Sequence, residues 1–107
     1  MSDGPDAAAG APAPGGMRDT ATVTFTVSGV ERFGDLGRLV GLADVEVVVD
    51  GVAIAVQGIR ILQRPGGGLA AEPPRFRRPD GRWTPSVGLP RALSDAIAAA
   101  VLEAYRG

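Results

Sequence analysis

The residues with the clearest chemical potential are arginines that gather around two aromatic side chains in the second half of the chain. A guanidinium group donates paired hydrogen bonds to phosphate oxygens. An aromatic ring beside it offers a surface on which a nucleic-acid base can stack. We therefore treat this group as candidate nucleic-acid-binding residues: Arg60, Arg75, Arg77, Arg78, Arg82, Phe76 and Trp83.

The positive charge of the chain is concentrated in this region. The chain has 107 residues and a formal net charge of only −1. Residues 57–91 carry seven arginines against two acids, whereas residues 1–56 carry three arginines against eight acids. A local positive field of this kind attracts anionic partners.

The residue types that are missing exclude several kinds of catalysis. The chain has no cysteine and no histidine, and all eleven of its cationic residues are arginines. Thiolate nucleophiles, a histidine general base, a Schiff-base lysine and a phosphate-loop lysine are thereby excluded. Asp44, Glu46 and Asp50 are the only clustered acids. Asp44 and Glu46 share a strand face where a hard cation could bind, but two carboxylates make a poor site. We expect a non-catalytic protein without a cofactor.

Two other interpretations of the arginines remain open. Arg77 and Arg78 can form a solvated face, or the arginines can pair with Glu72 and Asp80, while Trp83 covers an edge of the core. Alternatively, the same Arg/Trp surface binds an acidic protein partner, since tryptophan and arginine are common anchors of protein interfaces.

The elements that must position these residues begin after an N-terminal tail. Residues 1–19 are rich in Ala, Gly and Pro, a composition that predicts a disordered tail ahead of one domain over residues 20–107. The run 22–28 alternates strictly, with Val23, Phe25 and Val27 on one face, which predicts a half-buried strand. Residues 29–37 contain turn residues and charges, and we expect a loop there.

A β-hairpin is predicted around Asp50-Gly51, because Asp-Gly suits the positive φ angles of a type I′ turn. The two-residue turn pairs Val49 with Val52, Val47 with Ile54 and Val45 with Val56, all on one face that we expect to be buried. Along the strand that begins at Val52, the apolar positions that point inward then change from even to odd residue numbers. We therefore predict a bulge at Gln57-Gly58, after which Arg60 points away from the core.

The remaining elements complete an α+β domain. Residues 69–72 predict a short fourth strand, and residues 75–84 predict a hairpin that turns at Pro79-Asp80-Gly81. A C-terminal helix opens at Pro90, and its apolar stripe is Leu89, Leu93, Ile97, Val101 and Tyr105. The expected architecture is a twisted, mostly antiparallel sheet of about four to five strands with this helix packed on one face. No segment predicts a membrane span or a signal peptide, so we expect a cytoplasmic protein without a membrane partner.

The second half of the chain resembles the SpoVG family of bacterial septation and sporulation regulators. The likeness lies in the order of four features from Val52 to Tyr105: the strand VAIAVQGIRI, a Gly-rich turn with a short strand, the segment PPRFRRPDGRW, and a helix ending in AVLEAY. It covers roughly half of the chain. The resemblance implies a small α+β fold, a homodimer built by pairing strands, and regulation through binding of DNA or RNA without catalysis.

Overall fold

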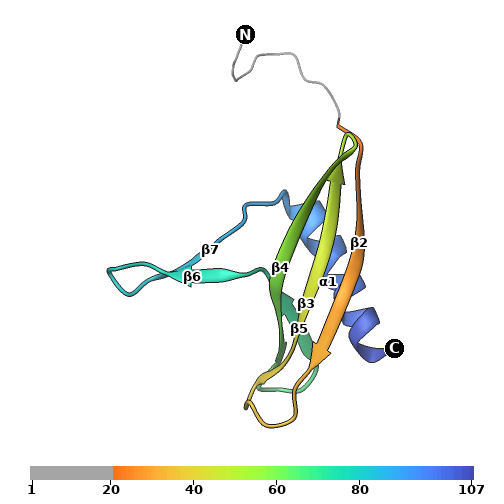
Figure 1. Cartoon of the computed structure of the whole chain (residues 1–107). Coiled ribbons are helices and arrows are strands. Elements are labelled where there is room, and N and C mark those ends of the chain that lie inside the picture. Colours follow the sequence, from red (N-terminus) through yellow and green to blue (C-terminus); the bar gives the residue numbers. More distant parts are fainter. Residues whose placement is uncertain (1–20) are drawn as a thin grey trace.

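The computed structural model describes residues 21–107. Within this range the chain forms a four-stranded antiparallel sheet, a separate two-stranded ribbon and one α-helix that packs against the sheet (Figure 1). The predicted α+β class is confirmed, although the second hairpin forms its own ribbon and does not extend the main sheet. The tail predicted over residues 1–19 lies outside the described residues.

The strands of the main sheet follow one another in space as they do in sequence, in the order β2-β3-β4-β5. The elements are β2 (Val23–Arg32), β3 (Leu39–Val49), β4 (Val52–Gln63), β5 (Leu69–Glu72), β6 (Arg75–Arg77), β7 (Trp83–Pro85) and α1 (Arg91–Arg106). The helix lies along one face of the main sheet, and the ribbon of β6 and β7 projects sideways from it (Figure 1).

The turn between β3 and β4 has the predicted geometry. Asp50 and Gly51 both have positive φ angles, of 48° and 85°. Val49 pairs with Val52, and the pairs beyond it also follow the predicted register. The Asp50 carboxylate also accepts a hydrogen bond from the backbone N–H of Thr22 at 2.9 Å, which ties the hairpin to the start of β2.

The predicted bulge at Gln57-Gly58 is confirmed, and it is centred on Asp44. Val45 pairs with Val56 and Ala43 pairs with Ile59, so Asp44 lies opposite two residues of β4. Its Oδ1 accepts a hydrogen bond from the N–H of Gly58 at 3.2 Å. Because Gly58 has a φ of 80°, the extra residue is absorbed there, and Val56 and Ile59 both point into the core with 4% of their surface exposed.

The loop predicted over residues 29–37 is confirmed for residues 33–37 and wrong for residues 29–32, because β2 continues to Arg32. Its pairing with β3 shifts between Val27 and Gly29, so Ser28 is an extra residue, again opposite the region of Asp44. Before this bulge the residues of β2 that face the core have odd numbers. Beyond it, the even-numbered Val30 packs against the core. The bulge breaks the period of two, which hid the continuation of the strand.

The helix α1 is fixed to the sheet at both its middle and its end. Ile97 and Val101 are buried, and Leu93 and Tyr105 pack partly buried beside them, as the apolar stripe predicted. At its C-terminus, the guanidinium of Arg32 donates hydrogen bonds to the carbonyl oxygens of Ala104 and Tyr105. A cation at this end is favoured by the helix dipole. The one helix of residues 21–107 is neither long nor apolar enough to span a membrane.

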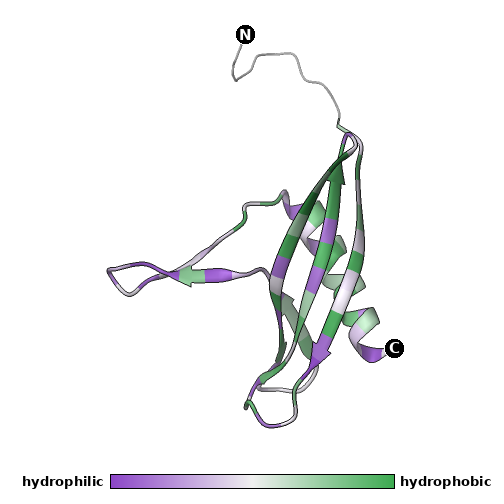
Figure 2. Ribbon diagram, in the orientation of Figure 1, coloured by the Kyte–Doolittle hydropathy of each residue, from purple (hydrophilic) through white to green (hydrophobic). Residues whose placement is uncertain are grey.

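The apolar face of the β3–β4 hairpin is only partly covered, which corrects the expectation that all of it is buried. Val52 and Ile54 are 62% and 49% exposed, and Val23 of β2, which lies beside Val49, is 39% exposed. The 12 residues of β4 span about 40 Å, whereas the 16 residues of α1 span about 24 Å. The helix therefore leaves the turn end of the sheet open, and apolar residues continue along β4 past the helix in Figure 2.

We expect Asp44→Ala to lower the free energy of unfolding by about 1 kcal/mol, because it removes the acceptor of the Gly58 N–H at the bulge. Glu46→Ala is the matched control, since it removes a carboxylate from the next exposed position of β3. Its effect should stay within about 0.5 kcal/mol. Urea denaturation of both variants measures the difference, and equal losses would contradict the role of Asp44.

Candidate nucleic-acid interface

The arginine-rich segment forms the ribbon of β6 and β7, whose turn has a defined geometry. The N–H of Gly81 donates to the carbonyl of Arg78 at 2.9 Å, and the N–H of Arg78 donates to the carbonyl of Arg82 at 2.8 Å. Gly81 has a φ of 91°. This is a type I turn followed by a glycine bulge, a common three-residue hairpin loop. The glycine bulge places Arg82 opposite Arg78.

The register divides the candidate residues between two faces of the ribbon. Arg77 pairs with Trp83, and Phe76 pairs with Thr84. Since side chains alternate along a strand, one face carries Arg75, Arg77 and Trp83, and we call it the Trp83 face. The opposite face, which we call the Phe76 face, carries Phe76, Arg78 and Arg82. Each face thus combines one aromatic ring with arginines.

Both aromatic rings are exposed, Trp83 by 57% and Phe76 by 44%. The interpretation that Trp83 covers an edge of the core is therefore wrong. The guanidinium of Arg75 lies 5.8 Å from the centre of the Trp83 ring, and that of Arg78 lies 5.3 Å from the centre of the Phe76 ring. Cation–π contacts of this kind hold each arginine beside its aromatic neighbour.

Three of the candidate arginines have a carboxylate neighbour, as one of the alternative interpretations expected. The Nε of Arg82 lies 2.8 Å from the Oδ2 of Asp80. The Oε1 of Glu72 lies 3.6 Å from the nearest nitrogen of Arg60 and also 3.6 Å from that of Arg75. Among residues 21–107 this oxygen is buried without a hydrogen-bond partner. The two long contacts therefore hold Arg60 and Arg75 loosely around one negative charge.

Arg77 and Arg78 differ from these three, because neither has an ion pair within the described part of the chain. Arg78 donates from Nε to the hydroxyl of Thr84 at 2.8 Å. The sequence pattern alone did not indicate Thr84 as an acceptor. The hairpin register, with Thr84 opposite Phe76, does indicate it. The guanidinium charges of Arg77 and Arg78 thus remain available to an anion, one on each face of the ribbon.

Arg60 reaches the site from the main sheet. It lies on β4 opposite Glu72 of β5, and this pairing brings it to the base of the ribbon. Together with Arg75 and Trp83 it lines an open hollow of about 450 Å³. The sheet therefore adds a third arginine to the Trp83 face.

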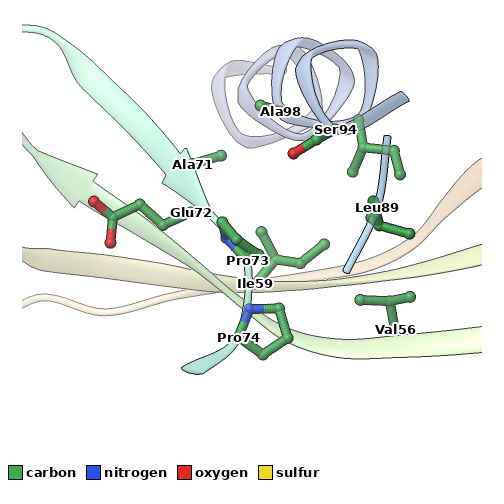
Figure 3. Close-up of a pocket in the computed structure, with 10 residues that line it drawn as sticks. Val56, Ile59, Ala71, Glu72, Pro73, Pro74, Leu89, Ser94 and Ala98 are labelled. Atoms are coloured by element: carbon green, nitrogen blue, oxygen red, sulfur yellow. The ribbon is translucent and has the colours of Figure 1, made fainter. Parts of the chain in front are cut away.

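The base of the ribbon is packed against both the sheet and the helix. Figure 3 shows Pro73 and Pro74 beside Ile59 of β4, with Ala98 of α1 on the other side of a small cavity. This cavity of about 20 Å³ is far below the size of small-molecule sites. The N–H of Ser86 donates to the carbonyl of Pro74 at 2.8 Å and closes the ribbon at its root. Two prolines and this bond fix the direction in which the ribbon leaves the sheet.

The acids considered as a cation site are used elsewhere. Asp44 binds the Gly58 N–H and Asp50 binds the Thr22 N–H. Residues 21–107 contain no group of three or more acidic, histidine or cysteine side chains placed to hold a metal ion.

The chain was also compared with known proteins. No model of a protein family matches it, and the search of curated proteins finds no similar sequence.

We expect the ribbon aromatics to contribute little to folding, because they contact neighbouring ribbon residues and not the core. Phe76→Ala and Trp83→Ala should each change the free energy of unfolding by less than about 1 kcal/mol. Ile61→Ala, at a fully buried position, is the control and should cost about 2–5 kcal/mol. Denaturant unfolding measures all three. A loss above about 2 kcal/mol for either aromatic variant would mean that the ring is a structural residue.

Proposed function

We propose that this chain is a SpoVG-like regulatory protein that acts as a homodimer and binds DNA or RNA mainly through the backbone phosphates. The observation that carries the proposal is the pair Arg77 and Arg78, which project without ion pairs in the described residues from opposite faces of a protruding, exposed ribbon. The order of features shared with the SpoVG family supports the same function.

The electrostatics of the ribbon favour phosphate groups over a purely structural role for its arginines. Residues 75–85 carry four arginines and one acid. Among residues 21–107, Asp80 pairs with Arg82 and Glu72 pairs with Arg75, so the uncompensated charge of the ribbon lies on Arg77 and Arg78. Like charges on a short ribbon repel one another, and an approaching row of phosphates relieves that repulsion. Arg60 and Arg75 share Glu72 and therefore contribute less per residue than Arg77 and Arg78.

The dimer part of the proposal is supported by an unprotected edge of the main sheet. β5 pairs with β4 only from Arg60 onward, so residues 52–57 of β4 have no second neighbouring strand within residues 21–107. Their sequence, VAIAVQ, contains no charge and no proline. Monomeric proteins usually protect such an edge with charged residues or prolines.

A second copy of the chain fits this edge. Antiparallel pairing of β4 with its symmetry mate satisfies two-fold symmetry, because each copy offers the same surface to the other. The pairing also brings the exposed side chains of Val52 and Ile54 next to those of the partner, which removes apolar surface from water.

We expect the double variant Arg77→Ala/Arg78→Ala to bind nucleic acid more weakly and with a flatter dependence on salt. Each lost phosphate contact on duplex DNA lowers the slope of log K against log salt by about 0.9, so the slope should fall by roughly 2. Fluorescence anisotropy with labelled mixed-sequence DNA and RNA, at several salt concentrations, measures both quantities.

Arg91→Ala/Arg106→Ala is the matched control, since it removes the same charge from the helix. It should leave the salt slope nearly unchanged. A poly-glutamate chain serves as a second ligand. If the protein binds poly-glutamate and no nucleic acid, the arginines serve an acidic protein partner and the proposed function is wrong.

We expect Ile54→Arg to convert the dimer to a folded monomer, because it places a charge in the middle of the exposed apolar row. Ala53→Arg is the control, since this neighbouring side chain points to the opposite face of β4. Sedimentation equilibrium gives the mass of each variant. A dimer that survives Ile54→Arg would place the interface elsewhere, and a wild-type monomer at all concentrations would remove dimerisation from the proposal.

A further inference from the structure

We infer that the Trp83 face is a site for single-stranded nucleic acid, in which a base stacks on the Trp83 indole while arginines beside it hold the adjoining phosphates. The inference rests on the proposed function and narrows it to one class of ligand and one face of the ribbon.

The first argument is the exposure of Trp83. More than half of its surface is open to solvent on a ribbon that projects from the sheet, where the ring contributes nothing to the core. An exposed large aromatic side chain is informative because burying it would be favourable. A nucleobase provides a flat partner of matching size, and stacking of this kind tolerates any base.

The second argument is the arrangement of charge around the ring. Arg77 lies directly across the ribbon from Trp83, and Arg75 lies two residues away on the same face. Two residues along a strand span about 6.6 Å, comparable to the spacing of consecutive phosphates in an extended single strand. The guanidinium of Arg75 lies over one face of the Trp83 ring, 5.8 Å from its centre, which leaves the other face for a base.

The third argument is the open space beside the Trp83 ring. The hollow of about 450 Å³ between Arg60, Arg75 and Trp83 opens beside the indole. Of the described residues only these three line it, so it is an open surface hollow and not an enclosed pocket. It can accept a splayed base or its sugar next to the ring.

The two faces of the ribbon are not equivalent. On the Phe76 face, the guanidinium of Arg78 lies near the ring and is also fixed by the hydroxyl of Thr84. The Phe76 ring is smaller and less exposed than that of Trp83. We therefore assign base stacking to Trp83 alone and phosphate contacts to both faces.

A duplex would not use this arrangement. Its bases are stacked on one another inside the helix, so the indole would find only groove edges and backbone. Single strands expose their base planes and can place one on Trp83.

The test uses the only tryptophan of the chain as the reporter. The full-length protein is titrated at low salt with mixed-sequence single-stranded DNA, single-stranded RNA, the matching DNA duplex and a single strand of abasic DNA. We expect both unmodified single strands to quench the Trp83 fluorescence and to bind more tightly than the duplex. The abasic strand, which keeps the phosphates, should bind more weakly and leave the fluorescence unquenched. The two unmodified strands show whether the site prefers DNA or RNA.

Two variants test the assignment to one face, with anisotropy of labelled single strands as the readout. Trp83→Ala should weaken single-strand binding about tenfold, and Trp83→Phe should restore part of the loss. Phe76→Ala should change it less than threefold. Equal effects of Trp83→Ala and Phe76→Ala would overturn the assignment.

The remaining outcomes separate this inference from the proposed function. A duplex that binds as tightly as the single strands, or bound single strands that leave the indole unquenched, would overturn the inference and leave phosphate binding intact. Absence of binding to every nucleic acid at low salt would overturn the proposed function and this inference together.

Discussion

The bulge at Gly58, whose N–H donates a hydrogen bond to the Asp44 carboxylate, is the local feature on which the inward and outward positions of β4 depend. Without an extra residue in β4, Val56 and Ile59 would point to opposite faces of the sheet, and half of the strand would lose its place in the core. The same change of phase turns Arg60 outward, where it meets Glu72. Pro74, at the root of the ribbon, lies beside Gly58. The bulge therefore links the packing of the sheet to the position of the arginine cluster.

The residues that stabilise the fold lie apart from the arginines of the ribbon. Stability comes from the aliphatic core, from the clamp of Arg32 on the end of α1, and from close packing at Gly41. A β-carbon at Gly41 would lie 2.8 Å from the carbonyl oxygen of Glu31 and 3.2 Å from the Tyr105 ring. The arginines of the ribbon do not have this stabilising role. Asp80 and Glu72 offset part of their mutual repulsion, and two guanidinium groups remain without an ion pair in the described residues.

The difference in length between the sheet and the helix has a second consequence. The N-terminus of α1 is the end nearer the β3–β4 turn and lies well short of it (Figure 1), so the same face that forms the core also presents exposed Val52 and Ile54. This open apolar surface lies next to the uncharged edge of β4. The ribbon leaves the sheet on the same side as this free edge of β4 (Figure 1), so the proposed dimer and the proposed nucleic-acid site would use neighbouring surfaces of the molecule.

The sequence by itself determined the features that depend on neighbouring residues. Asp50-Gly51 predicted the turn and the register of β3 and β4, the change from even to odd positions predicted the bulge at Gly58, and Pro79-Asp80-Gly81 predicted the turn of the ribbon. Local backbone preferences and side-chain alternation suffice for these. Only the tertiary structure decided that β2 continues past Ser28, that Ile54 is exposed, and that, among residues 21–107, Arg77 and Arg78 lack the carboxylate neighbours that Arg60, Arg75 and Arg82 have. These depend on which strand or helix packs against each residue, and that is set by contacts between segments distant in the chain.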